Sequence, residues 1–167
     1  DIFAYTRALD WLKSSIDDSD KLIIKNWLDN DPESLNECFY KDLEFGTGGL
    51  RGLMRLGSNG VNKYTLGLAT QGLSNYLNHK LNKKPKVAIA YDSRNNSKIF
   101  ADEVSKVLEA NNIDVFLFSE LRPTPQLSYA VRSLSCNAGI VITASHNPKE
   151  YNGYKVYWSD GGQLVPP

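Results

Sequence analysis

The apolar run Ala138-Gly139-Ile140-Val141-Ile142 constrains the fold of this chain more than any other stretch. It carries no charge and is typical of a buried strand. Asn147-Pro148 follows and predicts a turn, because proline fixes its own backbone and moves the preceding residue out of helix. Ser145 and His146 therefore stand where a buried strand gives way to a loop. Ligands of open α/β sheets bind beyond the carboxyl ends of strands, so Ser145 is the first candidate for chemistry.

Other apolar runs alternate with helical patterns, which predicts an α/β fold. We expect strands at 87–91, 115–118 and 138–143. A strand at 153–158 follows its predecessor too closely for a crossover helix, so it should run antiparallel. The prediction is a three-layer domain with a mostly parallel mixed sheet. The remaining expected elements are helices at 63–81, 97–110 and 123–134 and a short strand at 53–56.

Residues 1–42 form a helical N-terminal extension in this interpretation, because apolar residues recur there at helical spacing. Ser19 or Asp20 is the expected cap of its second helix, and Pro32 the first turn of its third. Further along, Asn62 and Ser97 are the expected caps of the next two helices. We find no chemistry in the extension.

The composition excludes several classes of protein. The formal net charge of +0 argues against partners such as nucleic acid or a membrane surface. Cys38 and Cys136 have no metal-ligand spacing and are interpreted as free thiols in a reducing compartment. The sequence has neither a signal-peptide pattern nor an apolar stretch that could span a bilayer, so we expect a cytoplasmic protein. Both ends look cut, which suggests a fragment of a longer chain.

The stretch from Phe45 to Gly52 is rich in glycine and contains Arg51. Glycines let backbone N–H groups approach a ligand closely, and such loops can bind anions. The planar guanidinium of Arg51 suits phosphate oxygens. No Gly-Lys-Ser/Thr follows, so the stretch is not a Walker A motif. A turn that serves only the backbone is the alternative interpretation.

Polar groups are expected to converge at one edge of the sheet: Arg51, the Asp92/Arg94 pair, and Ser145 with Lys155. A hydroxyl among cations suits a phosphorylated partner. Lys155 could act as a general acid or base if neighbouring positive charge lowers its pKa. A serine hydrolase would need a GxSxG elbow, which is absent here. A polar turn that satisfies only its own backbone stays open as an alternative.

Four stretches resemble the α-D-phosphohexomutases, the family of the phosphoglucomutases and phosphomannomutases. Thr143–Pro148 resembles the family's phosphoserine loop, and Phe45–Gly52 its N-terminal glycine-arginine loop. Tyr91–Arg94 and Asn152–Lys155 resemble two further motifs. The resemblance covers 43–167 and implies the N-terminal phosphoserine domain, domain I of four, with the later three absent.

The resemblance implies a mutase that moves a phosphoryl group between the C1 and C6 hydroxyls of a hexose phosphate, through a bisphosphorylated intermediate. The implied catalytic residues are Ser145, Lys155, Arg51 and His146. The implied phosphate-binding residues are Thr47, Gly48, Arg51, Arg94, Asn147 and Lys155. Phosphorylated Ser145 would also bind Mg²⁺, and glucose 1,6-bisphosphate or the matching sugar bisphosphate would be activator and intermediate.

Two alternatives stay open: a phosphopentomutase of the same family, and a non-catalytic module that binds sugar phosphates. The implied partners are a sugar phosphate and the remaining domains of the same chain. Residues 1–167 contain no acidic cluster that could complete a metal site. We therefore expect little activity from these residues alone, and an exposed apolar patch near residue 167.

Overall fold

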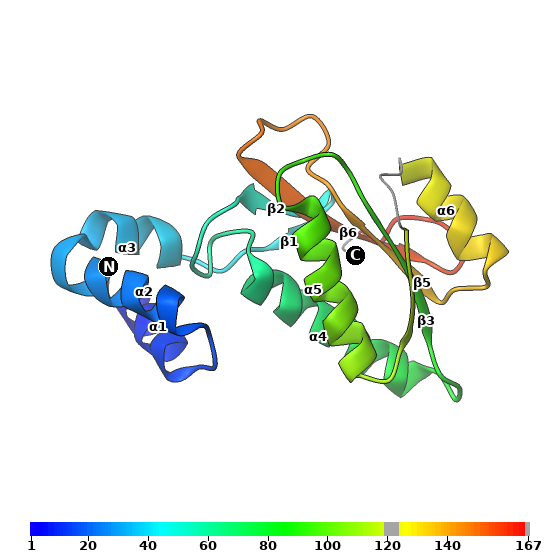
Figure 1. The fold of residues 1–167 in the computed structure, drawn as a ribbon, viewed down its shortest axis with the longest axis horizontal. Coiled ribbons are helices and arrows are strands. Elements are labelled where there is room, and N and C mark those ends of the chain that lie inside the picture. The colour runs from blue at the N-terminus through cyan, green and yellow to red at the C-terminus, as the bar shows by residue number, and fades with distance from the viewer. Residues whose placement is uncertain (119–123, 166–167) are drawn as a thin grey trace.

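Strands and helices alternate along most of the chain (Figure 1). The computed structural model describes residues 1–118 and 124–165. Its strands are β1 (Phe45–Gly46), β2 (Gly49–Leu53), β3 (Lys86–Tyr91), β4 (Asp114–Leu117), β5 (Ala138–Ile142) and β6 (Tyr151–Trp158). Its helices are α1 (Ile2–Lys13), α2 (Asp18–Asn30), α3 (Pro32–Phe39), α4 (Lys63–Lys80), α5 (Ser97–Ala110) and α6 (Thr124–Ser133). Within the described residues the strands form one sheet in the order β1-β2-β6-β5-β3-β4.

Helices cover both faces of this sheet, which confirms the three predicted layers. Along β3, Val87 and Ile89 pack into one core with α4 and α5, whereas Ala88 and Ala90 pack into another with α6. This division follows from the strand itself, because successive side chains point to opposite faces. Figure 1 shows α4 and α5 together, with α6 apart from them.

The sheet is mixed, and its antiparallel part is larger than expected. β3 runs parallel to β4 and β5, while β6 runs antiparallel to β5. β2 then pairs antiparallel with β6, and β1 with β2. The strand predicted at 53–56 is wrong, since Leu53 ends β2 and the glycine-rich stretch before it is a hairpin. The hydrogen bonds between strands come from the backbone, so β2 can pair with β6 although its glycines have low strand propensity.

The N-terminal helices have a core of their own. Ala8, Ile24 and Phe39 are fully buried within it. The ring of Trp11 lies edge-on to the rings of Phe39 and Tyr64, with centroids 5.3 and 5.6 Å apart. Because Tyr64 belongs to α4, this aromatic contact joins the helical extension to the α/β domain.

Some helix boundaries follow the sequence prediction. Pro32 begins α3, as expected. Asn62 caps α4, its side-chain oxygen accepting the N–H groups of Tyr64 and Thr65. The helix predicted from 123 begins at Thr124, and Pro123 lies outside the described residues.

Two predicted caps are wrong. The N-cap of α2 is Asp17 rather than Ser19 or Asp20, and it makes no capping hydrogen bond because its carboxylate pairs with a lysine at the start of α4. Ser97 is the first residue of α5, and the cap is Asn96 in a left-handed conformation with φ of 64°. Ser97 is unavailable as a cap because its hydroxyl belongs to the polar network described below.

An apolar groove of about 430 Å³ lies between α4 and the antiparallel part of the sheet. It extends to Leu164, in the region where an apolar patch was expected. Its walls are formed by Leu43, Phe45, Leu50, Ala69, Leu73, Tyr76, Tyr154, Val156, Trp158 and Leu164.

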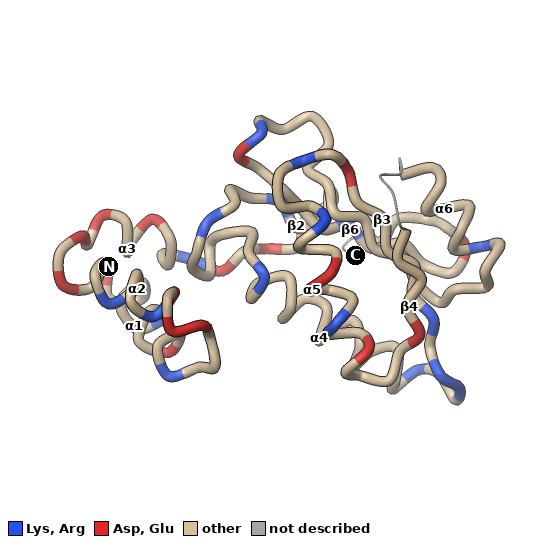
Figure 2. The backbone as a smooth tube through the Cα atoms, in the orientation of Figure 1, with Lys and Arg blue, Asp and Glu red and all other residues tan. Residues whose placement is uncertain are grey.

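The two cysteines are free, as interpreted from the sequence, and charges of both signs are spread over the described residues (Figure 2). Figure 2 shows Lys and Arg interspersed with Asp and Glu along the chain, in keeping with its net charge of +0. Cys38 and Cys136 are buried free thiols. None of the described helices has the length and apolar character that a membrane crossing requires.

Candidate functional site

The candidate site is built on the loop that follows β5. The Thr143 hydroxyl oxygen accepts the N–H of Ser145 at 3.0 Å. The Asn147 N–H donates to the Ala144 carbonyl at 3.1 Å and closes a turn. Ser145 lies at φ of 56°, a left-handed conformation that residues other than glycine adopt only when their surroundings impose it. Ser145 is exposed at the carboxyl end of β5.

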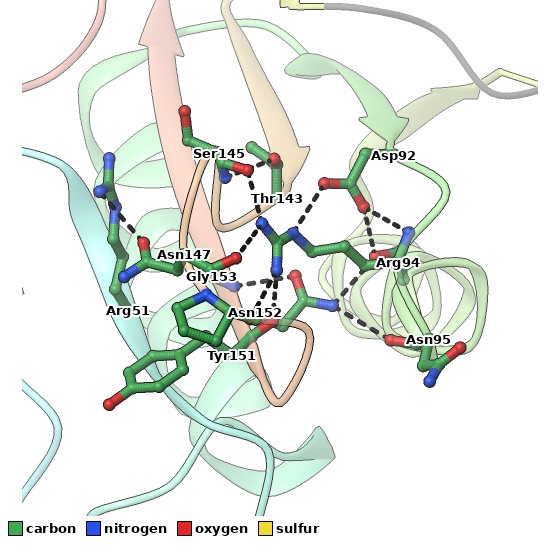
Figure 3. Close-up of polar contacts among 12 residues, drawn as sticks. Arg51, Asp92, Arg94, Asn95, Thr143, Ser145, Asn147, Tyr151, Asn152 and Gly153 are labelled. Atoms are coloured by element: carbon green, nitrogen blue, oxygen red, sulfur yellow. Dashed lines mark hydrogen bonds and ion pairs between the residues drawn. The ribbon is translucent and has the colours of Figure 1, made fainter.

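Arg94 lies inside the curve of this loop, and Figure 3 shows the Ser145 hydroxyl pointing away from it. One terminal nitrogen, Nη2, donates to the carbonyls of Ser145 and Asn147, the latter at 2.7 Å. The other, Nη1, donates to the carbonyls of Pro148 at 2.8 Å and Tyr151 at 3.2 Å. The structure therefore places Arg94, a predicted phosphate-binding residue, against the loop backbone.

A chain of polar contacts continues from Arg94 to β6. The Asp92 carboxylate lies 3.4 Å from Arg94 Nε, and it accepts the Arg94 backbone N–H at 3.0 Å. It also accepts the Ser97 hydroxyl at 2.8 Å. Asn152 in turn donates to Ser97 Oγ at 2.9 Å and to the Asn95 carbonyl at 3.3 Å (Figure 3). The end of β3 and the starts of β6 and α5 are thus joined behind the loop.

Asn152 is a site residue that our pattern analysis missed. It is fully buried, and its side-chain oxygen also accepts the N–H of Gly153 at 2.8 Å. The predicted strand started at Gly153, whereas β6 starts at Tyr151 and includes Asn152. The signal that could have found Asn152 was its place in a stretch that resembles a known motif.

The pairing of β2 with β6 brings two cations to one face of the sheet. Arg51 stands opposite Gly153, two residues before Lys155, and alternate residues of a strand share a face. Burial, followed by the positive charge of Arg51, lowers the pKa of the Lys155 ammonium. Arg51 Nη1 also reaches the side-chain oxygen of Asn147 at 3.4 Å (Figure 3). This contact joins the glycine-rich hairpin to the Ser145 loop.

Glycines shape the hairpin around Arg51. A Cβ at Gly48 would lie 2.8 Å from Arg51 Nη2, so the guanidinium occupies space that any other residue would fill. Gly49 has φ of 78°, and a Cβ there would clash with the backbone of β6. Thr47 is exposed at the tip, where its carbonyl accepts the Gln163 side-chain amide at 3.2 Å.

The structure gives less support to two other predictions, the catalytic role of His146 and the metal site at Ser145. His146 is exposed, and within the described residues its imidazole makes no side-chain hydrogen bond. In the part of the chain that the structure describes, no cluster of three His, Cys, Asp or Glu side chains could hold a metal ion. Ser145 was the one metal ligand predicted from the sequence, and the described residues place no such cluster of further ligands beside it.

Residues 42–167 match the family described as phosphoglucomutase/phosphomannomutase, alpha/beta/alpha domain I. The chain belongs to this family. Its relatives in the family include a phosphoglucomutase of Staphylococcus saprophyticus, 43% identical over 153 residues, and one of Staphylococcus aureus strain USA300, 49% identical over 128 residues. These alignments cover 84% and 77% of this chain. The family assignment confirms the resemblance drawn from the four sequence motifs.

A solved family structure supports the fold as well. The crystal structure of a putative phosphomannomutase from Thermus thermophilus superposes with a TM-score of 0.68 at 31% identity, covering 74% of this chain. The chain spans 28% of the S. saprophyticus protein, 23% of the S. aureus protein and 27% of the Thermus chain. It therefore corresponds to about a quarter of each of these family members.

Proposed function

We propose that this chain is the phosphoryl-carrying domain of a sugar-phosphate mutase, with Ser145 as the carrier. The supporting observation is the geometry of Ser145, whose hydroxyl is exposed at a left-handed backbone position while Arg94 holds the loop from the other side. A nucleophile presented in this way can accept and release a phosphoryl group without rearranging its loop. Arg51, bound to the same loop through Asn147, supplies positive charge for a dianionic group.

Lys155 is the proposed proton-transfer residue for Ser145. When the Oγ–P bond breaks and the phosphoryl group passes to a sugar hydroxyl, the Lys155 ammonium gives its proton to Oγ. In the return step its neutral amine takes the proton of the Ser145 hydroxyl as the new Oγ–P bond forms. Burial and the Arg51 charge lower the pKa of Lys155, which makes its neutral amine more accessible than that of an ordinary lysine. The attacking sugar hydroxyl loses its proton to a base outside this chain.

The proposed substrate is a hexose phosphate. The phosphoryl group moves between the C1 and C6 hydroxyls, and the bisphosphorylated sugar turns over before it returns a phosphoryl group to Ser145. The names of the Staphylococcus relatives favour glucose 1-phosphate and glucose 6-phosphate over the mannose pair. Glucose 1,6-bisphosphate is then the intermediate and activator. His146, Thr47 and Gly48 line the approach to this site in the proposal.

Magnesium is the implied cofactor, and the residues present do not make a complete site for it. Octahedral Mg²⁺ is usually held by one or two carboxylates together with substrate phosphates and water. The described residues offer no acidic cluster near Ser145. We propose phosphorylated Ser145 as one ligand, with any carboxylates supplied by parts of the protein outside residues 1–167.

The test is a turnover assay on the full-length protein with Ser145→Ala. Ser15→Ala is the matched control, because Ser15 is an exposed serine between α1 and α2 in the helical extension. We expect Ser145→Ala to abolish conversion of glucose 1-phosphate and Ser15→Ala to leave it unchanged. Conversion by Ser145→Ala at the wild-type rate would overturn the proposal.

The isolated 167-residue chain provides a second arm. We expect it to show no mutase turnover, because the metal carboxylates and the base for the sugar hydroxyl lie elsewhere in the proposed enzyme. Turnover comparable to that of the full-length protein would contradict the proposal that the metal carboxylates and the base lie outside these residues. Binding of sugar phosphate that survives Ser145→Ala, with no turnover in the wild type, would indicate a binding module instead.

A further inference from the structure

We propose that Arg94 is a positioning residue that sets the curvature of the Ser145 loop and does not contact the phosphoryl group. The inference rests on the proposed function in one respect, that Ser145 is the residue which the loop presents. It changes the role expected of Arg94 from the sequence, where the charge alone suggested a phosphate ligand. The reason is how the guanidinium donors are used.

A guanidinium has five N–H donors and no acceptor. Two on Nη2 face the carbonyls of Ser145 and Asn147, and two on Nη1 face those of Pro148 and Tyr151. The remaining nitrogen, Nε, lies 3.4 Å from the Asp92 carboxylate in an ion pair. Each of the three guanidinium nitrogens therefore has a protein partner, and a phosphate oxygen that approaches Nη1 or Nη2 would have to displace a loop carbonyl.

The arrangement also explains why the residue is arginine. Carbonyl oxygens from residues 145, 147, 148 and 151 converge on one point, and such a cluster of negative partial charge needs a cation at its centre. A planar fork can meet four oxygens at once, whereas a lysine has a single nitrogen with three N–H groups. A lysine at position 94 would keep the positive charge but could not bind all four carbonyl oxygens. This substitution therefore separates a role in positioning the loop from a role in binding phosphate.

The second half of the argument is what holds Arg94 itself. Its side chain is only 14% exposed, and Asp92 links it through Ser97 to Asn152 on β6. β6 is also the strand that carries Lys155. The network thus fixes the loop of Ser145 relative to the strand of its proposed proton donor. Catalytic groups misplaced by about 1 Å can lose about 100-fold in rate.

The experiment compares Arg94→Lys with the wild type in the full-length protein. Arg132→Lys, at an exposed arginine in the last turn of α6, is the control for the substitution itself. Two measurements are made: the kcat and KM for glucose 1-phosphate, and amide hydrogen exchange of residues 143–151 in the unphosphorylated protein. We expect Arg94→Lys to lower kcat about 100-fold and change KM less than about threefold. Exchange in 143–151 should accelerate, and Arg132→Lys should change neither.

A phosphate-binding role predicts the opposite pattern. Lysine would then keep a positive charge beside the phosphoryl group, so kcat would fall by less than about tenfold. Exchange in the unphosphorylated loop would stay at the wild-type rate. That result would overturn the inference. If the wild type carries no phosphoryl group on Ser145, the proposed function fails, while the exchange measurement still decides what Arg94 does.

Asp92→Asn keeps the inference testable if Arg94→Lys does not fold. It retains the guanidinium and removes only the charge that orients Nε. Loss of such an outer contact costs on the order of 10-fold in activity. We expect that loss in kcat, with KM unchanged and exchange in 143–151 accelerated. An effect confined to KM would contradict the inference.

Discussion

The loop after β5 and the β1–β2 hairpin both present residues to the same site, yet they are held in opposite ways. The loop leaves the sheet, and side chains hold its backbone, chiefly Arg94 and Thr143. The hairpin stays within the sheet, where β2 pairs with β6 and the side chain of Arg51, a proposed site residue, is exposed. The conformation of the loop therefore depends on particular side chains that bind its backbone. The conformation of the hairpin depends on glycines, at positions where any side chain would clash.

The largest expected effect on the hairpin comes from Gly49→Ala. The left-handed φ of 78° and the clash with the β6 backbone both oppose a Cβ there. Strained backbone positions cost on the order of 1–3 kcal/mol each, so we expect a loss of about 3 kcal/mol in the free energy of unfolding. Urea denaturation measures this loss.

Gly72→Ala is the matched control for that change. Gly72 lies in α4, and an added Cβ there would meet nothing within 4 Å. Alanine favours a helix by about 1 kcal/mol over glycine, so this variant should be more stable than the wild type. Equal changes in the free energy of unfolding for the two substitutions would contradict the view that the hairpin requires glycine at position 49.

Gly48→Ala should separate activity from stability. The added Cβ would meet the flexible end of Arg51, so we expect the unfolding free energy to change by less than about 0.5 kcal/mol. The displaced guanidinium should lower kcat/KM in the full-length protein about tenfold, equivalent to about 1.4 kcal/mol of transition-state binding. Steady-state kinetics and urea denaturation of one preparation test both statements.

Gly46→Ala is the control for Gly48→Ala, because its Cβ would make only an ordinary contact at 3.9 Å. It should leave kcat/KM near the wild-type value. In an Arg51→Gln background, Gly48→Ala should cause no further loss. A further tenfold loss in that background would show that Gly48 acts on something other than Arg51.

The smallest expected effect is a change in the pKa of Lys155 on Arg51→Gln. The Arg51 charge disfavours a second positive charge, so removing it should raise the pKa of Lys155 toward the usual lysine value. Burial remains the larger cause, so the return should be partial. The alkaline limb of activity, where the acid form is lost, should move to higher pH.

NMR titration of the lysine side chains measures this change directly. Lys98, whose pKa is raised by its hydrogen bond to Asp102, is an internal control and should titrate as in the wild type. A fall in the pKa of Lys155 on Arg51→Gln would contradict the proposed coupling between the hairpin and β6.

The same comparison shows what the sequence could predict. The strand before Ser145 was predictable because β5 is a continuous apolar run, and the turn after it because of Asn147-Pro148. The hairpin was not, since Gly46 and Gly49, which pair with each other, have little strand propensity of their own. The hairpin joins the sheet because β2 pairs with β6. Local pattern predicts an element only when its own residues favour it.

The contacts of Arg94 could not be predicted from the sequence for a different reason. The motif Tyr91–Arg94 indicated a cation at the end of a strand, but its four carbonyl partners lie 51 to 57 residues further along the chain. Which atoms a guanidinium meets is set by the fold. The sequence therefore indicated the cation, and the fold supplies its contacts with the loop backbone. That these contacts replace one with phosphate is our proposal.

The most direct test of the account is to locate the phosphoryl group. The full-length protein is incubated with glucose 1,6-bisphosphate, digested, and its peptides are analysed by mass spectrometry. The account predicts one phosphorylated site, at Ser145, and predicts that this site acquires labelled phosphate when glucose 1-phosphate with an isotopically labelled phosphate group is added. A phosphoryl group on another residue, or none under conditions where the enzyme turns over, would contradict it.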